Sequence, residues 1–323
     1  METLDLQLVH ALYVDGRASF RRIAAVLGVS EQTVARRYRR LRETGAVRVV
    51  GRLDPRYLGH AEEWVMRLRC VPSATLAVAQ ALAQRPDTYR IRLASGGTEI
   101  VCHMQTPDQR ARDTLLLDTL PATRQVTSID AHQVLRVFRG GPDGWHAPIA
   151  SLGPEQVAEL TPPPPDPAPL DLDDGDRLLL GELAHDGRMH HAALAASTGW
   201  HESTVRRRIA HLRAGGALYF GVDFDEQLLG YSSHTVLWIS VSPATLEAAG
   251  TALAQHPQIA HAAATTGPTN LTATVFCAGA DTLYGFVTDR VGCLPGIQTV
   301  QTAPVLRIVK RAGALDSEVR GRA

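Results

Sequence analysis

The sequence predicts an α+β protein in which two similar halves follow one another along the chain. Three observations lead to this fold class. The chain matches itself at a constant offset, the first part of each half has the apolar spacing of short helices, and the second part alternates like strands. We expect two winged-type helix-turn-helix domains and two ferredoxin-like (βαββαβ) domains in tandem, which together form a pseudo-dimer.

The repeat is seen at an offset of 171 residues. The tripeptide DGR at 15–17 recurs at 186–188, and Gly28 recurs as Gly199. This period is far longer than the roughly 20–50 residues of a solenoid repeat. The chain is therefore predicted to contain a duplicated multidomain unit.

Composition bounds the class of protein. Of the 323 residues, 45 % are hydrophobic and 20 % are charged, which is typical of globular domains and not of disordered chains. No run approaches the roughly 20 apolar residues that span a bilayer. Since the N-terminal segment also lacks a basic start and a signal-like core, we expect a cytoplasmic protein with no membrane partner.

Cysteine usage argues against metal and disulfide frameworks. The four cysteines are far apart and form no CxxC pair, and all lie in apolar stretches. We expect buried free thiols at Cys70, Cys102, Cys277 and Cys293.

The pattern along the chain gives the domain boundaries. The helix-turn-helix domains are predicted at 1–52 and 172–223, and the ferredoxin-like domains at 60–140 and 230–311. The proline-rich linker between the halves, 141–171, is predicted to be a passive tether, with a short helix at 154–160.

Three short helices are expected in residues 1–45. An apolar stripe at Leu4, Leu8 and Leu12 ends at the DGR turn. Ser19 and Ser30 can cap the next two helices, which Gly28 and Gly45 end. Val34, Tyr38 and Leu41 then face the core, and the second half repeats this pattern.

Strand and helix patterns alternate in the remainder of each half. In the first half, strands are predicted at 64–71, 88–94, 99–105 and 126–138, and helices at 73–84 and 108–119. In the second half, strands are predicted at roughly 232–241, 258–265, 270–277 and 298–309.

Arginines are concentrated on the predicted third helix. Although the net charge is zero, residues 17–52 hold ten arginines against two glutamates, and five of the seven residues 36–42 are arginine. These groups repel one another unless phosphates neutralise them, so this helix is predicted to bind double-stranded DNA. A solvated cationic face is the alternative.

The predicted DNA contacts follow from the outward face of each third helix. They are Ser30, Gln32, Thr33, Ala35, Arg36, Arg37, Arg39 and Arg40 in the first half, and Ser203, Thr204, Arg206, Arg207, Arg208 and His211 in the second. The second set is less basic, so we expect the two helices to contribute unequally to affinity.

The motifs resemble those of the Lrp/AsnC (leucine-responsive, feast/famine) transcriptional regulators. The matching residues are the DGR turn, the segments SEQTVARRYRRLRETGAV and HESTVRRRIAHLRAGGAL, and the glycine turns between the middle strands of each ferredoxin-like domain. The resemblance covers about 270 residues and implies a sequence-specific DNA-binding regulator. Because the family works as homodimers, two units in one chain look like a covalent pseudo-dimer, with higher homo-oligomers left open.

The family also implies a small effector, often an amino acid, held by a turn of the pattern glycine, two residues, then an acid. Here the turns read Gly-Gly-Thr-Glu and Gly-Pro-Thr-Asn, so the second has lost the carboxylate. The implied effector residues are Gly96, Thr98, Glu99, Gly267, Thr269 and Asn270. Glu99 is expected near the surface. Tight strand turns without a ligand are the alternative.

The competing class is enzymatic. Sirohaem decarboxylases resemble the same architecture, sometimes as fused pairs, and use histidine and arginine on a tetrapyrrole. The stretch 269–272 (TNLT) lacks the aromatic and tryptophan residues of their pattern. We see no triad, HExxH or P-loop motif, and expect no catalytic residue, metal or cofactor.

Overall fold

The computed structural model describes residues 1–54, 57, 62–106, 109–140, 145, 149–166, 172–311 and 314–315. The chain folds into two compact units, each drawn from both halves of the sequence. Unit 1 comprises 1–59 and 146–229, and unit 2 comprises 60–145 and 230–323. The two helix-turn-helix domains therefore associate with each other, as do the two ferredoxin-like domains.

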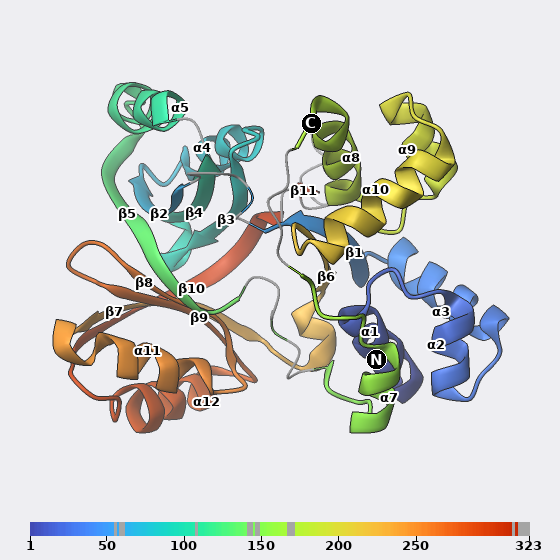
Figure 1. Ribbon diagram of the computed structural model, residues 1–323. Coiled ribbons are helices and arrows are strands. Elements are labelled where there is room, and N and C mark those ends of the chain that lie inside the picture. The colour runs from blue at the N-terminus through green and yellow to red at the C-terminus, as the bar shows by residue number, and fades with distance from the viewer. Residues whose placement is uncertain are drawn as a thin grey trace. The chain divides into compact units, whose positions relative to one another are not determined.

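Unit 1 contains matching helices and strands from the two repeats (Figure 1). The first repeat supplies α1 (Thr3–Val14), α2 (Phe20–Leu27), α3 (Glu31–Glu43) and β1 (Val47–Leu53), and the second supplies α8 (Asp174–His185), α9 (His191–Thr198), α10 (Glu202–Ala214) and β6 (Leu218–Phe224). The three expected helices are present in each repeat. The 3₁₀ turn η6 (Glu226–Leu229) follows β6.

The strands β1 and β6 join the two helix-turn-helix domains. They pair antiparallel from Val47 opposite Phe224 to Leu53 opposite Leu218, so Val50 lies opposite Gly221. Val50 and Gly221 are equivalent positions at the offset of 171 residues. The ribbon therefore has a local two-fold axis at its centre, as in a symmetric dimer.

The described part of the linker is not a passive tether. The helix α7 (Pro154–Leu160) packs against α1 and α2 and buries Leu160 completely. His10 Nδ1 accepts hydrogen bonds of 3.0 Å from the backbone N–H groups of Ser151 and Leu152. Gln156 Nε2 donates to Val26 O at 2.9 Å. The short helix expected at 154–160 is therefore present, but composition did not reveal that burial of Leu160 attaches it to the domain. Residues 141–144, 146–148 and 167–171 lie outside the described residues.

Unit 2 has the expected strand and helix order in both repeats. The first contributes β2 (Glu62–Cys70), α4 (Thr75–Ala83), β3 (Thr88–Ala94), β4 (Glu99–Thr106), α5 (Gln109–Asp113), the π-helical segment η3 (Thr114–Thr119), α6 (Leu120–Ala122) and β5 (Val126–Arg139). The second contributes β7 (Ser233–Val241), η7 (Pro243–Thr245), α11 (Leu246–Ala254), β8 (Ile259–Thr265), β9 (Leu271–Cys277), α12 (Ala280–Gly285), the π-helical segment η8 (Phe286–Val291), β10 (Ile297–Arg311) and β11 (Ala314–Leu315).

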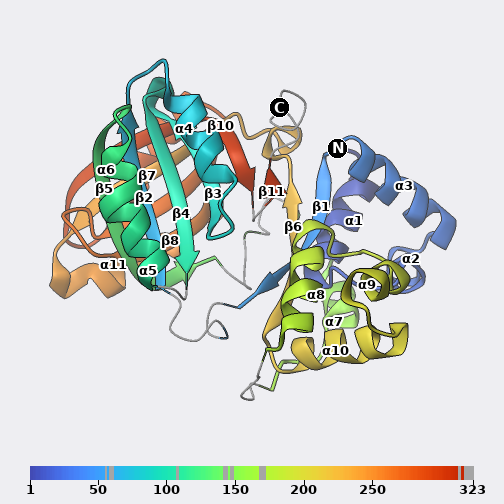
Figure 2. The same ribbon diagram turned by 90° about the horizontal axis from the view of Figure 1, so that it is seen from above.

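The last long strand of each ferredoxin-like domain is shared between the domains. The described strands follow the order β11-β10-β3-β4-β2-β5-β8-β9-β7, and β10 also pairs with β7. The first part of β5 pairs with β2 of its own repeat, and its end pairs with β8. Similarly, β10 pairs with β7 and then with β3. Figure 2 shows α4, α5 and α6 over one face of β2, β3 and β4.

This strand exchange carries side chains into the neighbouring core. Val309 of β10 lies in the core of the first domain with Ala79, and Phe138 of β5 packs on the core of the second. Position 250 is the equivalent of Ala79, and a Cβ atom on Gly250 would meet the Phe138 ring at 2.2 Å. The larger aromatic side chain is therefore accommodated by a smaller residue on α11.

Of the four expected buried thiols, Cys293 is exposed, whereas Cys70, Cys102 and Cys277 are buried. The three buried cysteines lie on strands of the core. Cys293 instead follows η8 in a turn, so its apolar neighbours in the sequence do not place it inside.

Candidate nucleic-acid interface

The helices α3 and α10 are presented by the same local structure. Gly28 and Gly199 end the preceding helices with φ of 67° and 73°, which glycine adopts without steric strain. Ser30 Oγ accepts the Thr33 N–H at 3.1 Å and so caps α3. His201 stands at the equivalent position before α10 and makes no side-chain cap bond in the described chain.

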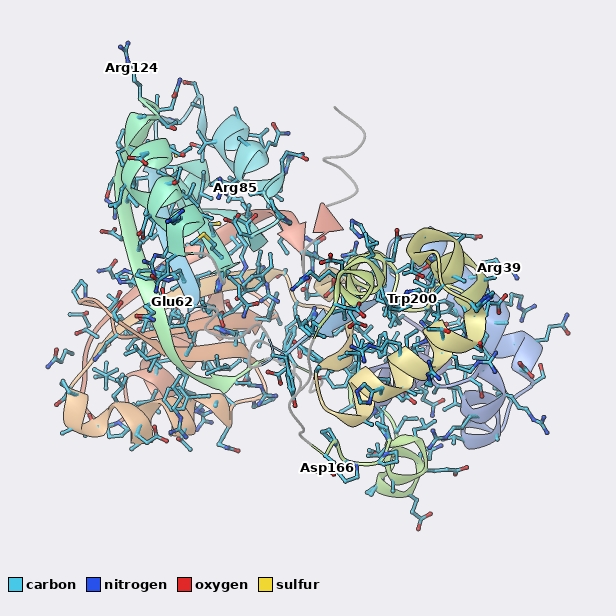
Figure 3. All side chains as sticks on the ribbon, turned by 45° about the horizontal axis from the view of Figure 1, so that its top comes forward. Arg39, Glu62, Arg85, Arg124, Asp166 and Trp200 are labelled. Carbon is cyan, nitrogen blue, oxygen red and sulfur yellow. The ribbon has the colours of Figure 1, made fainter. Side chains whose placement is uncertain are left out.

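The inward faces match the prediction. Val34, Tyr38 and Leu41 of α3 are buried, as are Val205, Ile209 and Leu212 of α10. The outward faces carry most of the predicted contact residues. Those exposed are Ser30, Gln32, Arg36, Arg39 (Figure 3), Arg40, Ser203, Arg206, Arg207 and His211, while Thr33, Ala35 and Thr204 are half-buried.

Two predicted contact residues at equivalent positions bind carboxylates inside their own domains. Arg37 Nη1 lies 2.9 Å from Asp5 Oδ1, and Arg208 Nε donates to Asp176 Oδ1 at 2.5 Å. Asp5 is 2 % exposed and Asp176 is 0 % exposed. Since Arg37 and Arg208 are equivalent, as are the two aspartates, each repeat anchors its third helix to its first in the same way. Arg37 and Arg208 thus position these helices.

The anchoring aspartates were missed by sequence reasoning. The signal was available, because an aspartate recurs at the same position of the first helix in both copies. Arg40 also binds Asp5, with Nη2 2.6 Å from Oδ2, although its side chain stays 53 % exposed. The position equivalent to Arg40 is His211, which leaves the second repeat with a different outward charge.

A hollow of about 280 Å³ lies on α10, which together with α3 forms the pair of recognition helices. It is lined by Thr204, Arg207, Arg208 and His211. All four were predicted to contact DNA. Their side chains gather on one face of α10 because they are spaced by three or four residues.

The first predicted effector turn is tight, but its acid is buried. The turn η2 (Ser95–Gly97) holds Ser95, Gly96 and Gly97 at φ of 53°, 71° and 83°, and Thr98 Oγ1 donates to Ser95 O at 2.8 Å. Contrary to expectation, Glu99 is only 2 % exposed, and its Oε2 lies 2.9 Å from Arg67 Nε.

Glu99 is buried because β4 is covered where the two ferredoxin-like domains pair. The residue pattern of the turn does not reveal this covering. Arg67 is held in turn by a 2.7 Å hydrogen bond to Gln301 Oε1 and by the Trp238 ring, 5.4 Å from its guanidinium carbon. The other carboxylate oxygen, Glu99 Oε1, has no hydrogen-bond partner among the described residues.

The second predicted turn is closed by its own side chains. Gly267 has φ of 97°, and Thr265 Oγ1 donates to Thr269 O at 3.1 Å. The Asn270 amide accepts the Val241 N–H and donates to Val241 O, both at 2.9 Å. Both polar atoms of Asn270 are therefore used within the fold, unlike the carboxylate of Glu99.

Unit 2 also buries a group of basic side chains from both repeats. The His103 and His261 rings lie 5.7 Å apart, and Arg92, 2 % exposed, donates to Thr274 Oγ1 at 3.2 Å. Burial, reinforced by Arg90 and Arg92, lowers the pKa of His261 to about 3. Burial and Arg92 also hold the pKa of His103 well below its ordinary value. Both imidazoles are therefore neutral at pH 7.

Comparison with known proteins places this architecture in a family. The model of the AsnC-type helix-turn-helix domain matches residues 1–42 and 172–213, and that of the Lrp/AsnC ligand binding domain matches 235–315. Together these matches span more than half of the chain. The chain belongs to the Lrp/AsnC family. Its tandem duplication places two units of that family in one polypeptide.

Curated relatives match about one repeat. The chain is 28 % identical over 145 residues to the HTH-type transcriptional regulator FL11 of Pyrococcus horikoshii, covering 45 % of this chain and 95 % of the regulator. It is 26 % identical over 142 residues to the HTH-type transcriptional regulator Ptr1 of Methanocaldococcus jannaschii, covering 44 % of this chain and 96 % of that protein.

A solved structure matches nearly the whole chain. The siroheme decarboxylase NirDL superposes with a TM-score of 0.65, covering 98 % of this chain and 96 % of its own, at 13 % identity. A structural match at this low sequence identity shows a shared fold and nothing more. In the described residues, no three histidine, cysteine or carboxylate side chains are placed to hold a metal ion. The described helices are also too short or too polar to cross a bilayer.

Proposed function

We propose that this Lrp/AsnC protein is a transcriptional regulator whose single chain binds an asymmetric operator through α3 and α10. The carrying observation is that two equivalent recognition helices with different exposed side chains belong to one compact unit. A homodimer presents identical helices and so reads two identical half-sites. This chain presents two different surfaces.

Positions 32 and 35 of the first repeat are the proposed base readers. Gln32 and Ala35 correspond to Ser203 and Arg206 in the second repeat. Glutamine favours adenine, alanine can contact the thymine methyl group, and arginine prefers guanine. The half-site read by α3 is thus expected to be richer in A·T pairs, and that read by α10 to contain a guanine.

Selection from a random duplex library tests this assignment. The wild-type motif should be asymmetric, and the double variant A35R/R206A should exchange the half-site preferences. The matched control is A35S/R206K, which keeps small and cationic side chains in place. A palindromic wild-type motif, or unchanged preferences in the swap, would show that other residues read the bases.

We infer that a small effector binds at the first glycine turn and not at the second. Glu99 Oε1 is a buried acceptor without a partner in the described chain, whereas both polar side-chain atoms of Asn270 are hydrogen-bonded to Val241. Such a carboxylate suits an ammonium group, as carried by a free amino acid. The ligand is therefore expected to be an amino acid.

A thermal-shift screen with the common amino acids tests the effector. E99Q should abolish the response, and N270A should leave it intact. Because Glu99 pairs with Arg67, E99Q is also expected to lower the unliganded melting temperature. A response that survives E99Q would place the pocket elsewhere.

We propose that the chain has no tetrapyrrole decarboxylase activity. The stretch 269–272 lacks the aromatic residues of those enzymes, and Asn270 is closed on β7. The visible spectrum of the protein with added sirohaem should show the free pigment only. A shifted absorption band together with carbon dioxide release would establish the enzyme instead.

A further inference from the structure

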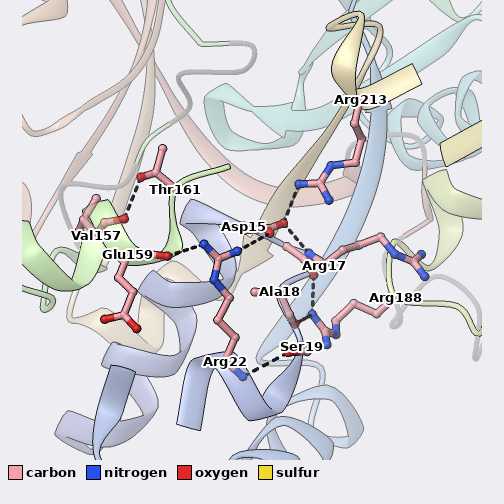
Figure 4. A network of polar contacts seen from close by, with 11 residues as sticks. Asp15, Arg17, Ala18, Ser19, Arg22, Val157, Glu159, Thr161, Arg188 and Arg213 are labelled. Carbon is pink, nitrogen blue, oxygen red and sulfur yellow. Dashed lines mark hydrogen bonds and ion pairs between the residues drawn. The ribbon is translucent and has the colours of Figure 1, made fainter. Parts of the chain in front are cut away.

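The repeated DGR tripeptide forms reciprocal contacts between the two helix-turn-helix domains. Figure 4 shows those that Arg188 and Arg213 make with the first turn. Arg17 donates to the backbone of the other copy, with Nη1 2.9 Å from Gly187 O and Nη2 3.1 Å from Met189 O. Arg188 returns the contact, with Nη1 2.6 Å from Gly16 O and 3.0 Å from Ala18 O. Each arginine thus holds the turn that carries the other.

The aspartates of the two turns bind the last turns of the recognition helices. Asp15 Oδ1 accepts from Arg213 Nη2 at 2.8 Å, and Asp186 Oδ2 accepts from Arg42 Nη2 at 2.7 Å. Arg42 and Arg213 lie near the ends of α3 and α10. Each recognition helix is therefore attached at its C-terminal end to the DGR turn of the opposite repeat.

The glycines of the two turns allow close approach to the β1–β6 ribbon. A Cβ atom on Gly16 would lie 2.7 Å from Phe220 Cβ, and one on Gly187 would lie 2.9 Å from the Val50 carbonyl carbon. Gly187 N also donates to Val49 O at 2.8 Å. All three residues of the motif thus act at the contact between domains.

The contact between the two DGR turns is rigid because its donors and acceptors have fixed directions. A guanidinium presents its donors in a rigid planar fork, and here the forks bind backbone carbonyls. Burial, followed by the charges of Arg188 and Arg213, lowers the pKa of Arg17. Arg188 lies 4.5 Å over the Phe20 ring. These two half-buried cations keep their positions because the carbonyls and aspartates satisfy them.

We propose that the two DGR turns form an interlock that sets the separation of α3 and α10, so that the chain reads its half-sites at one spacing. The inference rests on the proposed function, because it concerns how both helices meet one duplex. Each added base pair moves a half-site by about 3.4 Å and rotates it by about 35°. A locked pair of helices cannot follow such a change.

Binding to a spacing series tests the interlock. The selected half-sites are separated by spacers that differ in single base pairs, and the Kd of each duplex is measured. Wild type should lose about tenfold in affinity one base pair from the optimum. R17M/R188M should bind all spacings within about threefold of one another. The control R124M/R177M removes two exposed arginines outside the contact and should keep the wild-type profile.

A measurement without DNA separates the interlock from the proposed function. Spin labels at E43C and A214C, equivalent exposed positions at the ends of α3 and α10, are introduced in a C293S background. The distance distribution should be narrow in wild type and broad in R17M/R188M. The milder R42M/R213M, which removes only the outer ion pairs, should broaden it partially, and far-UV circular dichroism verifies folding of each variant.

The outcomes distinguish the two proposals. If the duplexes are not bound while the distance broadens as stated, the DNA function fails and the interlock stands. If the distance distribution or the spacing profile of folded R17M/R188M equals that of wild type, the interlock is wrong.

Discussion

The two helix-turn-helix repeats share their anchoring ion pairs and the contacts of their DGR turns, but their exposed side chains differ. Asp5 and Asp176 anchor arginines at equivalent positions, and the DGR turns make equivalent contacts. Among the exposed positions, Arg39 corresponds to Ala210 and Arg40 to His211. Buried and bonded positions resist change because each loss is costly, whereas exposed positions change freely. The comparison separates residues that build the unit from residues that meet a partner.

The two repeats also differ at equivalent positions that contact each other across the pseudo-two-fold axis. Arg52 and Asp223 are equivalent positions, and they form an ion pair of 2.8 Å. Arg67 and Trp238 are equivalent as well, and they stack. In a homodimer such positions would hold identical residues, and like charges would repel. Duplication in one chain therefore permits complementary partners where symmetry would otherwise impose identical ones.

The largest effect is expected from removing the arginine that anchors α10. R208M leaves the buried Asp176 without a cationic partner among the described residues and should destabilise the domain by about 3–5 kcal/mol. R37M should cost only about 1–2 kcal/mol, because Arg40 still binds Asp5. Hydrogen exchange of the α8–α10 and α1–α3 amides measures each domain separately. Equal losses would mean that Arg40 does not support Asp5.

A second prediction concerns the exchanged strands. G250A should cost about 1–3 kcal/mol, because the new methyl group meets the Phe138 ring. The double variant F138V/G250A reproduces the Val309–Ala79 pair of the other repeat and should recover most of the loss. Denaturant unfolding of unit 2 measures both. If the double variant is less stable than G250A alone, the compensation is not local.

Acid should destabilise unit 2 more than unit 1. The pKa values of His103 and His261 are lowered in the fold, so below pH 6.5 the unfolded chain binds protons that the folded chain does not. Stability then falls by about 1.4 kcal/mol per pH unit for each such histidine. For His261 the loss continues down to a pH of about 3, its folded pKa. Melting temperatures from pH 7.5 to 5 test this, with H261N expected to flatten the slope.

The smallest effect is expected when single residues on the outward faces of α3 and α10 are replaced. R40A should weaken DNA binding more than H211A at pH 7.5, and should reduce the salt dependence by up to about one unit of slope. Because Arg40 also binds Asp5, the melting temperature of the R40A variant is measured as well. Fluorescence anisotropy at several salt concentrations measures both variants. Equal salt slopes for the two would remove the proposed asymmetry.

The sequence by itself determined the elements and their order. Local signals sufficed, because capping serines, glycine stops and strand alternation act over a few residues. The 171-residue offset predicted the duplication, and the inward faces of α3 and α10 followed from helical spacing. The DGR motif was recognised as a repeated turn, but nothing local revealed what Arg17 and Arg188 bind.

The tertiary structure decided which charged groups pair and which strands are exchanged. Glu99 is buried on Arg67, the segment before α7 is held by His10, and β5 and β10 complete the neighbouring domains. These contacts join residues far apart in sequence, and their energies depend on burial that exists only once both repeats have folded together. A local pattern has the same form whether its side chain ends in solvent or in a partner domain, so only the folded pair distinguishes the two.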